Sequence, residues 1–242
     1  MSQLPTIITE TVSYFVINKP AGFAVEPVGD FPNILDWLIA ENKINKDEWL
    51  PDSRFGVVHR LDVETSGILI WAKNSTAQDQ LKQLWQGRSV EKTYIGLAVG
   101  ELAPEEGSVE LPIIRDNRGD KQTIALLPNP KARPAITTYK KLDTAKVEND
   151  TVSLIEAHPI TGRTHQIRVH LKYLSHPIIG DKLYGDKRGD SIAKKLGLNR
   201  HFLHAQQLCL TWKGERVCYQ APLPLELNDI LDRLQIRARA IF

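Results

Sequence analysis

The chain contains 242 residues, of which 42% are hydrophobic and 25% are charged, with 31 Lys and Arg against 29 Asp and Glu. These values are typical of a folded globular protein of one large or two small domains, and they exclude a disordered or fibrous chain. No apolar run in the sequence approaches the roughly 20 residues that cross a bilayer, and residues 1–10 lack the basic and apolar regions of a secretory signal. We therefore expect a soluble, cytoplasmic protein.

The sequence contains two cysteines, Cys209 and Cys218. A chain of this length buries enough surface to fold without a covalent cross-link, so we expect two reduced thiols. Their spacing of nine residues also differs from that of a CxxC metal site.

The charge is unevenly distributed along the chain. Residues 160–216 contain eleven Lys and Arg against four acidic residues, a local balance of +7 in a protein of net charge +2. Five of the seven histidines lie in the same stretch. This distribution is typical of a surface that contacts phosphate, and a solvated basic surface is the alternative interpretation.

The first predicted elements are a hairpin and a short helix. Residues 11–18 are rich in β-branched and aromatic side chains, and the turn 19–22 that follows predicts a hairpin with residues 23–25. Apolar residues recur over residues 34–39 at helical spacing, after a capping Asn33, and predict an amphipathic helix.

Two strands and a second helix come next. Strands are expected at residues 55–61 and 67–73, on either side of a short loop at residues 62–66. Asn74 is a predicted N-cap and Gly87 a predicted end for a helix between them. The apolar face of that helix consists of Ala77, Leu81, Leu84 and Trp85.

Residues 90–99 alternate between two faces and predict a strand. One face carries Thr93, Ile95, Leu97 and Val99, and the other carries Lys92, Tyr94, Gly96 and Ala98. Tyr94 is therefore expected to stand among small neighbours.

The second half of the chain predicts a mixture of strands and helices. Prolines break residues 110–139 into short strands. A helix begins at a capping Thr164 and ends before Pro177, with Ile167 and Leu171 buried and with His165, Arg168 and Lys172 on the opposite face. The remaining expected elements are a strand at 152–157, loop and short helix at 181–200, a strand at 201–212 and a helix at 225–240.

This order of elements favours an α+β fold with a large mixed, mostly antiparallel sheet and flanking helices, because strands outnumber helices without alternating with them. The glycine fingerprints of Rossmann and P-loop sites do not occur in the sequence. A nucleotide cofactor is therefore not expected.

The segment His59–Gly67 is the most informative for chemistry. Its Asp62 lies in a tight predicted loop between two strands, beside Arg60 and before the hydroxyls of Thr65 and Ser66. A carboxylate held in this way suits a nucleophile or a charge stabiliser. The alternative is an Asx-turn, in which Asp62 only accepts hydrogen bonds from nearby backbone N–H groups.

Several blocks of the sequence resemble the RluA-like family of RNA pseudouridine synthases, which isomerise uridine in ribosomal and transfer RNA. They occur in the family's order between residues 14 and 224. The blocks are residues 18–22 (NKPAG), 59–62 (HRLD) with 65–67 (TSG), 91–94 (EKTY) with Gly100, 162–170 (GRTHQIRVH), 176–181 (HPIIGD) with 184–185 (YG), 203–205 (LHA) and 221–224 (APLP).

The resemblance implies an isomerase with a pseudouridine synthase fold, a central catalytic cleft and Asp62 as the catalytic aspartate. Moving uracil from an N1 link to a C5 link requires breaking a glycosidic bond, turning the base and forming a bond to carbon. An ionised carboxylate can act there as nucleophile or as partner to cationic sugar character. No metal or redox cofactor is needed. Attack on ribose C1′, attack on the base and proton abstraction all remain open.

The resemblance also implies roles for other residues. Arg168 matches the family's active-site arginine and is expected to pair with Asp62 and keep it ionised. Tyr94 matches the active-site tyrosine, expected to stack on the target uracil. Arg60 is expected to fill the gap left when the uridine leaves the RNA stack. Further candidates for RNA or wall contacts are Lys19, Lys92, Arg163, His165, Lys172 and Leu203, whereas His204 is expected to be a buried, hydrogen-bonded histidine.

We interpret residues 1–242 as one catalytic domain without the N-terminal RNA-binding domain that many family members carry. The expected partner is ribosomal or transfer RNA, with no membrane and no nucleotide cofactor, and we expect a monomer. RNA selection would then depend on the catalytic domain, including the basic residues 181–200. His165 and His170 are five residues apart, which does not match a zinc motif.

Two other classes of function remain as alternatives. A catalytically inactive RNA-binding or ribosome-assembly factor would need the basic segment, but it could dispense with Asp62, Tyr94 and Arg168. A glycoside or nucleoside hydrolase would use Asp62 and Glu64, although such enzymes need their carboxylates roughly 5 to 9 Å apart across the bond. A hydrolase releases free uracil, and an isomerase does not.

Overall fold

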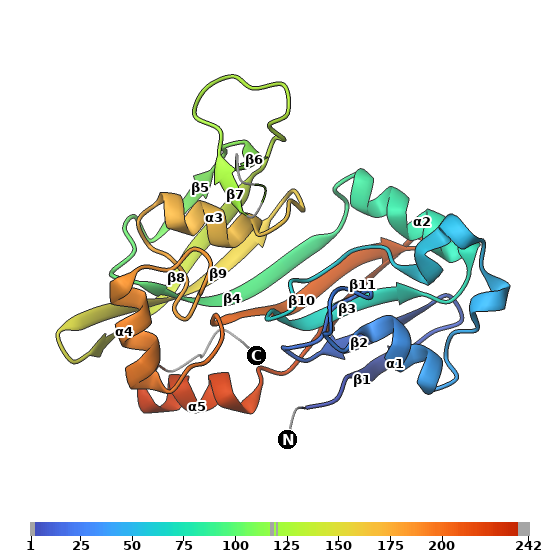
Figure 1. The fold of residues 1–242 in the computed structure, drawn as a ribbon, viewed down its shortest axis with the longest axis horizontal. Helices are drawn as coiled ribbons and strands as arrows, with labels where there is room; N and C mark the ends of the chain where they lie inside the picture. Colours follow the sequence, from blue (N-terminus) through green and yellow to red (C-terminus); the bar gives the residue numbers. More distant parts are fainter. Residues whose placement is uncertain (1–2, 117–118, 120, 237–242) are drawn as a thin grey trace. The chain divides into compact units, whose positions relative to one another are not determined.

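Figure 1 shows the computed structural model of the protein, which describes residues 3–116, 119 and 121–236. The chain divides into two compact units. Among the described residues, unit 1 contains 3–91 and 205–222, and unit 2 contains those of 92–204 and 223–236. Both units combine strands with helices, so the predicted α+β class is confirmed. That the two units act as one catalytic domain stays a prediction.

Unit 1 is built around strands in the order β1-β2-β3-β10, with β11 paired to β10. β2 pairs antiparallel with both β1 and β3, and β10 pairs antiparallel with β11. Every residue of β3 is buried, so both of its faces are covered. This explains its nearly continuous apolar sequence, which lacks the alternation of a strand with one wet face. The strands are β1 (Thr6–Glu10), β2 (Tyr14–Lys19), β3 (Ser66–Ala72), β10 (Leu203–Trp212) and β11 (Glu215–Gln220).

Two α-helices of unit 1 begin at the predicted caps. The Asn33 side chain accepts a hydrogen bond from the Asp36 N–H at the start of α1 (Ile34–Ala40). The Asn74 side chain accepts one from the Ala77 N–H at the start of α2 (Ser75–Gln86). These bonds satisfy backbone donors that a helix leaves open at its first turn. Short 3₁₀ turns occupy Lys46–Glu48 and Pro51–Gly56.

The predicted hairpin between residues 11–18 and 23–25 is wrong. β2 forms its hairpin with β1, and Ala24 makes only an isolated bridge to Asn33. The turn after β2 is used differently, because the Gly22 N–H donates to the carbonyl oxygen of Val63, 2.9 Å away. A contact 41 residues along the chain is outside the reach of a local turn pattern.

The predicted strand at residues 55–61 is also wrong. A 3₁₀ turn reaches Gly56, with Arg54 and Phe55 in the left-handed region, and only Val57 forms a β-bridge. Two consecutive left-handed residues cannot continue a strand. Gly56 has a φ of 94°, and a Cβ there would lie 2.3 Å from the carbonyl oxygen of Ala72. Gly56 therefore packs closely against the backbone of β3, and residues 55–61 form no regular strand beside it.

Unit 2 contains strands in the order β4-β9-β8-β5, all paired antiparallel, and a separate β6–β7 hairpin. The first residues of β10, Leu203 and His204, also belong to this unit. The prolines at 112, 128, 130 and 134 lie outside these strands, in agreement with the sequence pattern. The strands are β4 (Glu91–Val99), β5 (Glu106–Val109), β6 (Ile113–Arg115), β7 (Gln122–Ile124), β8 (Thr137–Val147) and β9 (Asp150–Pro159).

The described part of unit 2 contains three α-helices: α3 (Gln166–Tyr173), α4 (Lys187–Leu196) and α5 (Leu225–Arg233). α3 packs against β7, β8 and β9 (Figure 1). Its N-cap is His165 in the left-handed conformation rather than the predicted Thr164. α5 ends at Arg233 rather than at residue 240, because Gln235 has a positive φ of 57°, which is incompatible with a right-handed helix. Residues 237–240 of the predicted helix lie outside the described residues.

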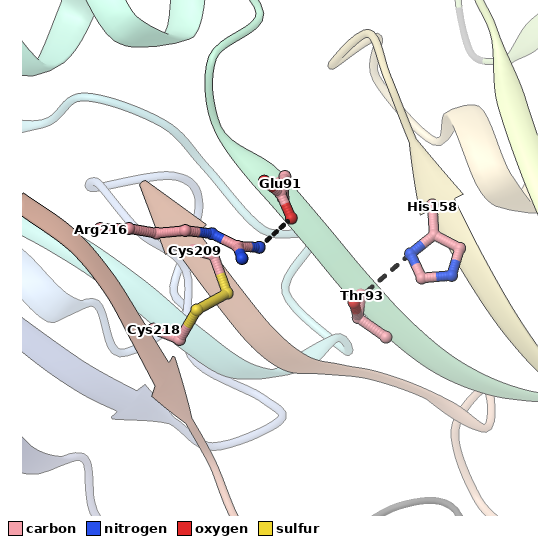
Figure 2. The surroundings of a disulfide bond; sticks show 6 residues. All are labelled: Glu91, Thr93, His158, Cys209, Arg216 and Cys218. Carbon is pink, nitrogen blue, oxygen red and sulfur yellow. Dashed lines mark hydrogen bonds and ion pairs between the residues drawn. A yellow bond between two sulfur atoms is a disulfide. The ribbon is translucent and has the colours of Figure 1, made fainter. Parts of the chain in front are cut away.

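Figure 2 shows that Cys209 and Cys218 form a disulfide bond, so the prediction of two reduced thiols is wrong in this structure. The two residues are direct partners in the β10–β11 register, with Cα atoms 4.1 Å apart. Directly opposed residues of an antiparallel pair lie close enough for such a bond. The spacing alone did not reveal this register. An ion pair between Arg216 and Glu91, 2.7 Å, lies beside the disulfide.

Candidate active site

The Asp62 loop of unit 1 is a closed turn before β3. The Thr65 N–H donates to the carbonyl oxygen of Asp62, 3.0 Å away. Asp62 is half-buried, whereas Thr65 and Ser66 are buried. The next residue, Gly67, has a φ of 120°, and a Cβ there would lie 2.2 Å from the carbonyl oxygen of Ala205. Only glycine fits that close approach, so the start of β3 fixes one end of the loop.

Lys19 supports the same loop. Its side chain is fully buried, and its ammonium donates to the carbonyl oxygens of Pro20, Phe23 and Val63 at 2.9, 2.7 and 3.0 Å. Val63 directly follows Asp62 in the chain. This position corrects the prediction of an RNA contact for Lys19, because an ammonium turned inward to three carbonyl oxygens does not suit a phosphate.

His59 fixes the chain on the other side of Asp62. Its Nε2 accepts a hydrogen bond of 2.9 Å from the Ile70 N–H of β3, and its ring stacks on Trp85 of α2 with centroids 4.6 Å apart. The intervening Arg60 is exposed. That exposure suits the RNA contact proposed for Arg60, which stays a prediction.

Tyr94 lies in β4 of unit 2 and is half-buried. Its direct partner on β9 is Ala157, and Gly96 follows on the same face, but Tyr94 also packs against a cluster of larger apolar side chains that includes Ile167 and Leu203, so its surroundings are only partly small. The neighbouring Thr93 hydroxyl lies 3.4 Å from Nδ1 of His158 (Figure 2).

Lys92, at the start of the same strand, is half-buried. Its ammonium donates to the carbonyl oxygen of Thr161 over 3.3 Å. Burial lowers the pKa of Lys92 from 10.5 to about 8. The side chain therefore carries a positive charge near neutral pH that is lost more easily than that of an exposed lysine.

Arg168 lies on α3 and is buried, and its expected pairing with Asp62 stays a prediction. Its Nε donates to Oδ2 of Asp181 at 2.7 Å, and its Nη2 donates to Oδ1 at 2.8 Å. The guanidinium also lies over the ring of Tyr184, 5.0 Å from the centroid. Helical phase identified the face, but it did not show that the segment 180–185 covers it.

Asp181 is a partner of Arg168 that the sequence pattern did not reveal. Burial raises the pKa of Asp181, but the hydrogen bonds and charge of Arg168 outweigh this effect and hold the pKa below its ordinary value. Asp181 and Tyr184 both occur within the matched blocks, so their position was visible. The glycines on either side of them, Gly180 and Gly185, could have indicated a tight turn that fixes the positions of both side chains.

The other predicted contact residues of unit 2 fall into two groups. His165 and Arg163 are half-buried at the start of α3, where Arg163 Nε donates to the carbonyl oxygen of Pro134 at 3.0 Å, and Lys172 is exposed. Leu203 and His204 are buried, as expected for His204. Leu203 packs in an apolar cluster with residues of β9 and α3, which suits a wall residue better than a direct polar contact.

The basic stretch is partly engaged within the protein. Lys187, Arg188, Lys194 and Lys195 are exposed on α4. Asp150 pairs with Arg188 and Glu148 pairs with Lys195, each at 2.7 Å. Arg200 is buried, and its Nε donates to Glu226 at 2.7 Å. The exposed positive charge of this stretch is therefore smaller than the number of its basic residues implies.

Membrane spans and metal clusters do not occur in the described residues. None of the helices in that part of the chain has the length and apolar character of a membrane span. Across residues 3–116, 119 and 121–236, no three His, Cys, Asp or Glu side chains come together in a group that could hold a metal ion.

Comparison with known proteins places this arrangement in a family. Residues 13–173 match the family described as RNA pseudouridylate synthase. An uncharacterized RNA pseudouridine synthase from Chloroflexus aurantiacus is 40% identical over 231 residues, covering 91% of this chain and 66% of the relative. Ribosomal large subunit pseudouridine synthase D from Neisseria meningitidis is 37% identical over 244 residues, covering 96% of this chain and 62% of the relative. The chain thus spans less than two thirds of the length of these two relatives.

A solved structure agrees with the sequence match. Human RNA pseudouridylate synthase domain containing 4 superposes with a TM-score of 0.74 at 30% sequence identity, covering 95% of this chain and 92% of that chain. The family match includes the Asp62 loop, Tyr94 and Arg168, and it extends over more than half of the chain. The chain therefore belongs to the RNA pseudouridylate synthase family.

Proposed function

We propose that this protein isomerises specific uridines of RNA to pseudouridine, with Asp62 as the catalytic residue. The observation that carries the proposal is the Asp62 loop, a closed turn tied at Val63 by Lys19 and Gly22, within the family match. A carboxylate on so constrained a backbone is held in place for chemistry. The relative named ribosomal large subunit pseudouridine synthase D favours ribosomal RNA over transfer RNA as the substrate class.

The reaction balances without a second reactant. The bond from uracil N1 to ribose C1′ breaks, a bond from C5 to C1′ forms, the C5 proton leaves and N1 gains a proton. In this proposal the Asp62 carboxylate serves as nucleophile or stabilises cationic sugar character. Tyr94 stacks on the target uracil, and Arg168 supplies the positive charge that keeps the catalytic carboxylate ionised.

RNA must open to be modified, because C1′ and C5 of one uridine cannot both be reached inside a helix. We propose that the exposed Arg60 fills the gap that the extruded uridine leaves in the RNA stack. The candidates for phosphate contacts are the half-buried or exposed Lys92, Arg163, His165 and Lys172, together with the exposed lysines of α4. Such contacts set affinity and register and read no base.

Product analysis tests the proposal. Unmodified transcripts of large-subunit ribosomal RNA and of transfer RNA are incubated with the wild-type protein and with Asp62→Asn, then digested to nucleosides. We expect pseudouridine without free uracil from the wild type, and none from the variant. Release of free uracil would identify a hydrolase instead, and tight binding without either product would identify an RNA-binding factor. Deleting the gene and mapping the uridine that loses its modification would then identify the position.

A further inference from the structure

We infer that Asp181 and Tyr184 are positioning residues that hold the Arg168 guanidinium in one orientation. The consequence for the reaction rests on the proposed function, in which Arg168 belongs to the site. The holding itself concerns only side chains of unit 2 and can be tested without any reaction.

The contacts fix both the edge and the face of the guanidinium. Asp181 accepts two parallel hydrogen bonds from Arg168, in an ion pair whose side chains are 8% and 0% exposed. A two-bonded fork of this kind sets the direction of the guanidinium plane as well as its distance. The Tyr184 ring, 5.0 Å from the guanidinium carbon, covers one face of that plane through a cation–π contact.

Each positioning residue is itself held. Oδ1 of Asp181 also accepts hydrogen bonds of 3.0 Å from the backbone N–H groups of Leu183 and Tyr184. The Tyr184 hydroxyl accepts one of 2.9 Å from the Gln122 N–H and lies 2.8 Å from Nδ1 of His165. The carboxylate and the ring therefore have little freedom to follow Arg168 if it moves.

The turn that carries both residues takes its shape from its glycines. Gly180 has a φ of 76°, and a Cβ there would lie 2.2 Å from the carbonyl oxygen of Arg200. A Cβ on Gly185 would lie 2.4 Å from the carbonyl oxygen of Asp181, which already accepts a 2.7 Å hydrogen bond from the Gly185 N–H. The segment 180–185 is thus closed on itself with Asp181 and Tyr184 directed at α3.

Stability alone does not account for this arrangement. Burying two charges costs a large desolvation free energy, and well-packed apolar side chains of similar volume often stabilise a fold equally well. What an apolar pair cannot supply is a positive charge in a fixed direction. The structure therefore supports a role in orienting Arg168 for chemistry on the RNA.

A double-mutant cycle tests the inference. Asp181→Asn and Tyr184→Phe are made in the wild type and in Arg168→Lys, and single-turnover rates at saturating RNA and RNA affinities are measured. In the wild-type background we expect Asp181→Asn to lower the rate about 100-fold, as a misplaced catalytic group does, with RNA affinity unchanged. Tyr184→Phe keeps the ring and removes its hydroxyl bonds, so we expect the rate to fall about tenfold.

In the Arg168→Lys background, where the fork is already absent, both substitutions should lower the rate less than about threefold. Equal decreases in the two backgrounds would overturn the inference, as would a wild-type rate for both single variants. Asp150→Asn is the matched control, because it breaks an arginine–carboxylate pair of the same unit, with Arg188, that does not include Arg168. It should leave the rate unchanged.

Thermal unfolding gives a readout that does not depend on activity. Melting temperatures are measured for the wild type, Asp181→Asn, Arg168→Lys and the double variant. The decreases caused by the two single substitutions should be strongly non-additive in the double variant. Additive decreases would overturn the inference that Asp181 holds Arg168. If Asp181→Asn does not fold, Tyr184→Phe decides the question in the same two backgrounds. If the wild type forms no pseudouridine, the proposed function fails, while the unfolding cycle still decides whether Asp181 holds Arg168.

Discussion

The ammonium of Lys19 donates to the carbonyl oxygen of Val63, the residue after Asp62, although the two are 44 positions apart in the chain. Lys19 thereby joins the end of β2 to the loop that carries the proposed catalytic carboxylate. The charge that the sequence pattern assigned to RNA is used inside unit 1 to fix backbone.

Lys19→Met should therefore act on stability and on the rate rather than on RNA affinity. Three buried carbonyl oxygens are left without a charged donor, and we expect the free energy of unfolding to fall by about 3 kcal/mol. Urea unfolding measures this decrease. Lys43→Met is the control, because Lys43 pairs with Glu10 at a partly exposed site, where an ion pair contributes about 0.5 kcal/mol. Weaker RNA binding with unchanged stability would restore Lys19 as a phosphate contact.

Asp62→Asn should abolish turnover and leave fold and RNA affinity intact. The amide keeps the size and part of the hydrogen bonding of the carboxylate, but it removes the charge that the proposed chemistry requires. Single-turnover assays at saturating RNA check the rate, and filter binding checks affinity. More than about one hundredth of the wild-type rate would rule out an essential role for Asp62, since removal of an essential nucleophile lowers the rate by orders of magnitude.

Arg168→Met should lower both the rate and the stability. It leaves the Asp181 carboxylate buried with no arginine to pair with, and breaking one side of a buried pair costs about 3–5 kcal/mol. Denaturant unfolding measures this cost. Asp181→Asn added to Arg168→Met should restore part of the stability, because a neutral amide costs less to bury than an unpaired charge. No recovery in the double variant would contradict this account.

The pH dependence of stability should report Lys92. Because burial lowers its pKa to about 8 from 10.5, the unfolded chain binds more protons than the folded protein between these two pH values. The contribution of Lys92 to the free energy of unfolding therefore becomes more favourable to the folded protein as the pH rises from about 8 to 10.5. We expect the difference in unfolding free energy between the wild type and Lys92→Met to shift in favour of the wild type from pH 8 to pH 10.5. A flat difference would show that the lysine is not buried in solution.

RNA affinity should depend on the exposed basic residues of α4. Neutralising Lys187, Arg188, Lys194 and Lys195 together should weaken the dependence of RNA affinity on salt. The slope of the logarithm of the affinity against the logarithm of the salt concentration should fall in magnitude by about 0.7 for each phosphate contact removed on single-stranded RNA, equally for target and unrelated RNA. The rate at saturating RNA should stay near that of the wild type. Because Arg188 and Lys195 already pair with acidic residues, Lys187→Gln with Lys194→Gln should account for most of the change.

The control for this prediction is Lys43→Gln with Lys46→Gln, which removes two exposed lysines of unit 1. Measuring affinity across a salt series for both double variants separates a specific surface from general charge. An unchanged slope for the α4 variants would show that this helix faces solvent in the complex.

Features that depend on near neighbours could be predicted from the order of residues alone. Asn33 and Asn74 cap their helices because a cap needs only the backbone N–H groups three residues on. The alternation of β4 predicted that Gly96 shares a face with Tyr94, since side-chain direction in a strand follows the period of two. The motif blocks predicted the family for a similar reason, because they are runs of adjacent residues.

Features that depend on which distant segment covers a side chain became visible only in the folded chain. From the sequence we expected an RNA or wall contact for Lys19, a polar helix face for Arg168 and free thiols for the two cysteines. The structure shows contacts that this reasoning did not include: Lys19 with Val63, Arg168 with Asp181, and the two cysteines with each other, at sequence separations of 44, 13 and 9 residues. Burial and strand register arise from packing between remote parts of the chain, and a local pattern of residue types carries no information about that packing.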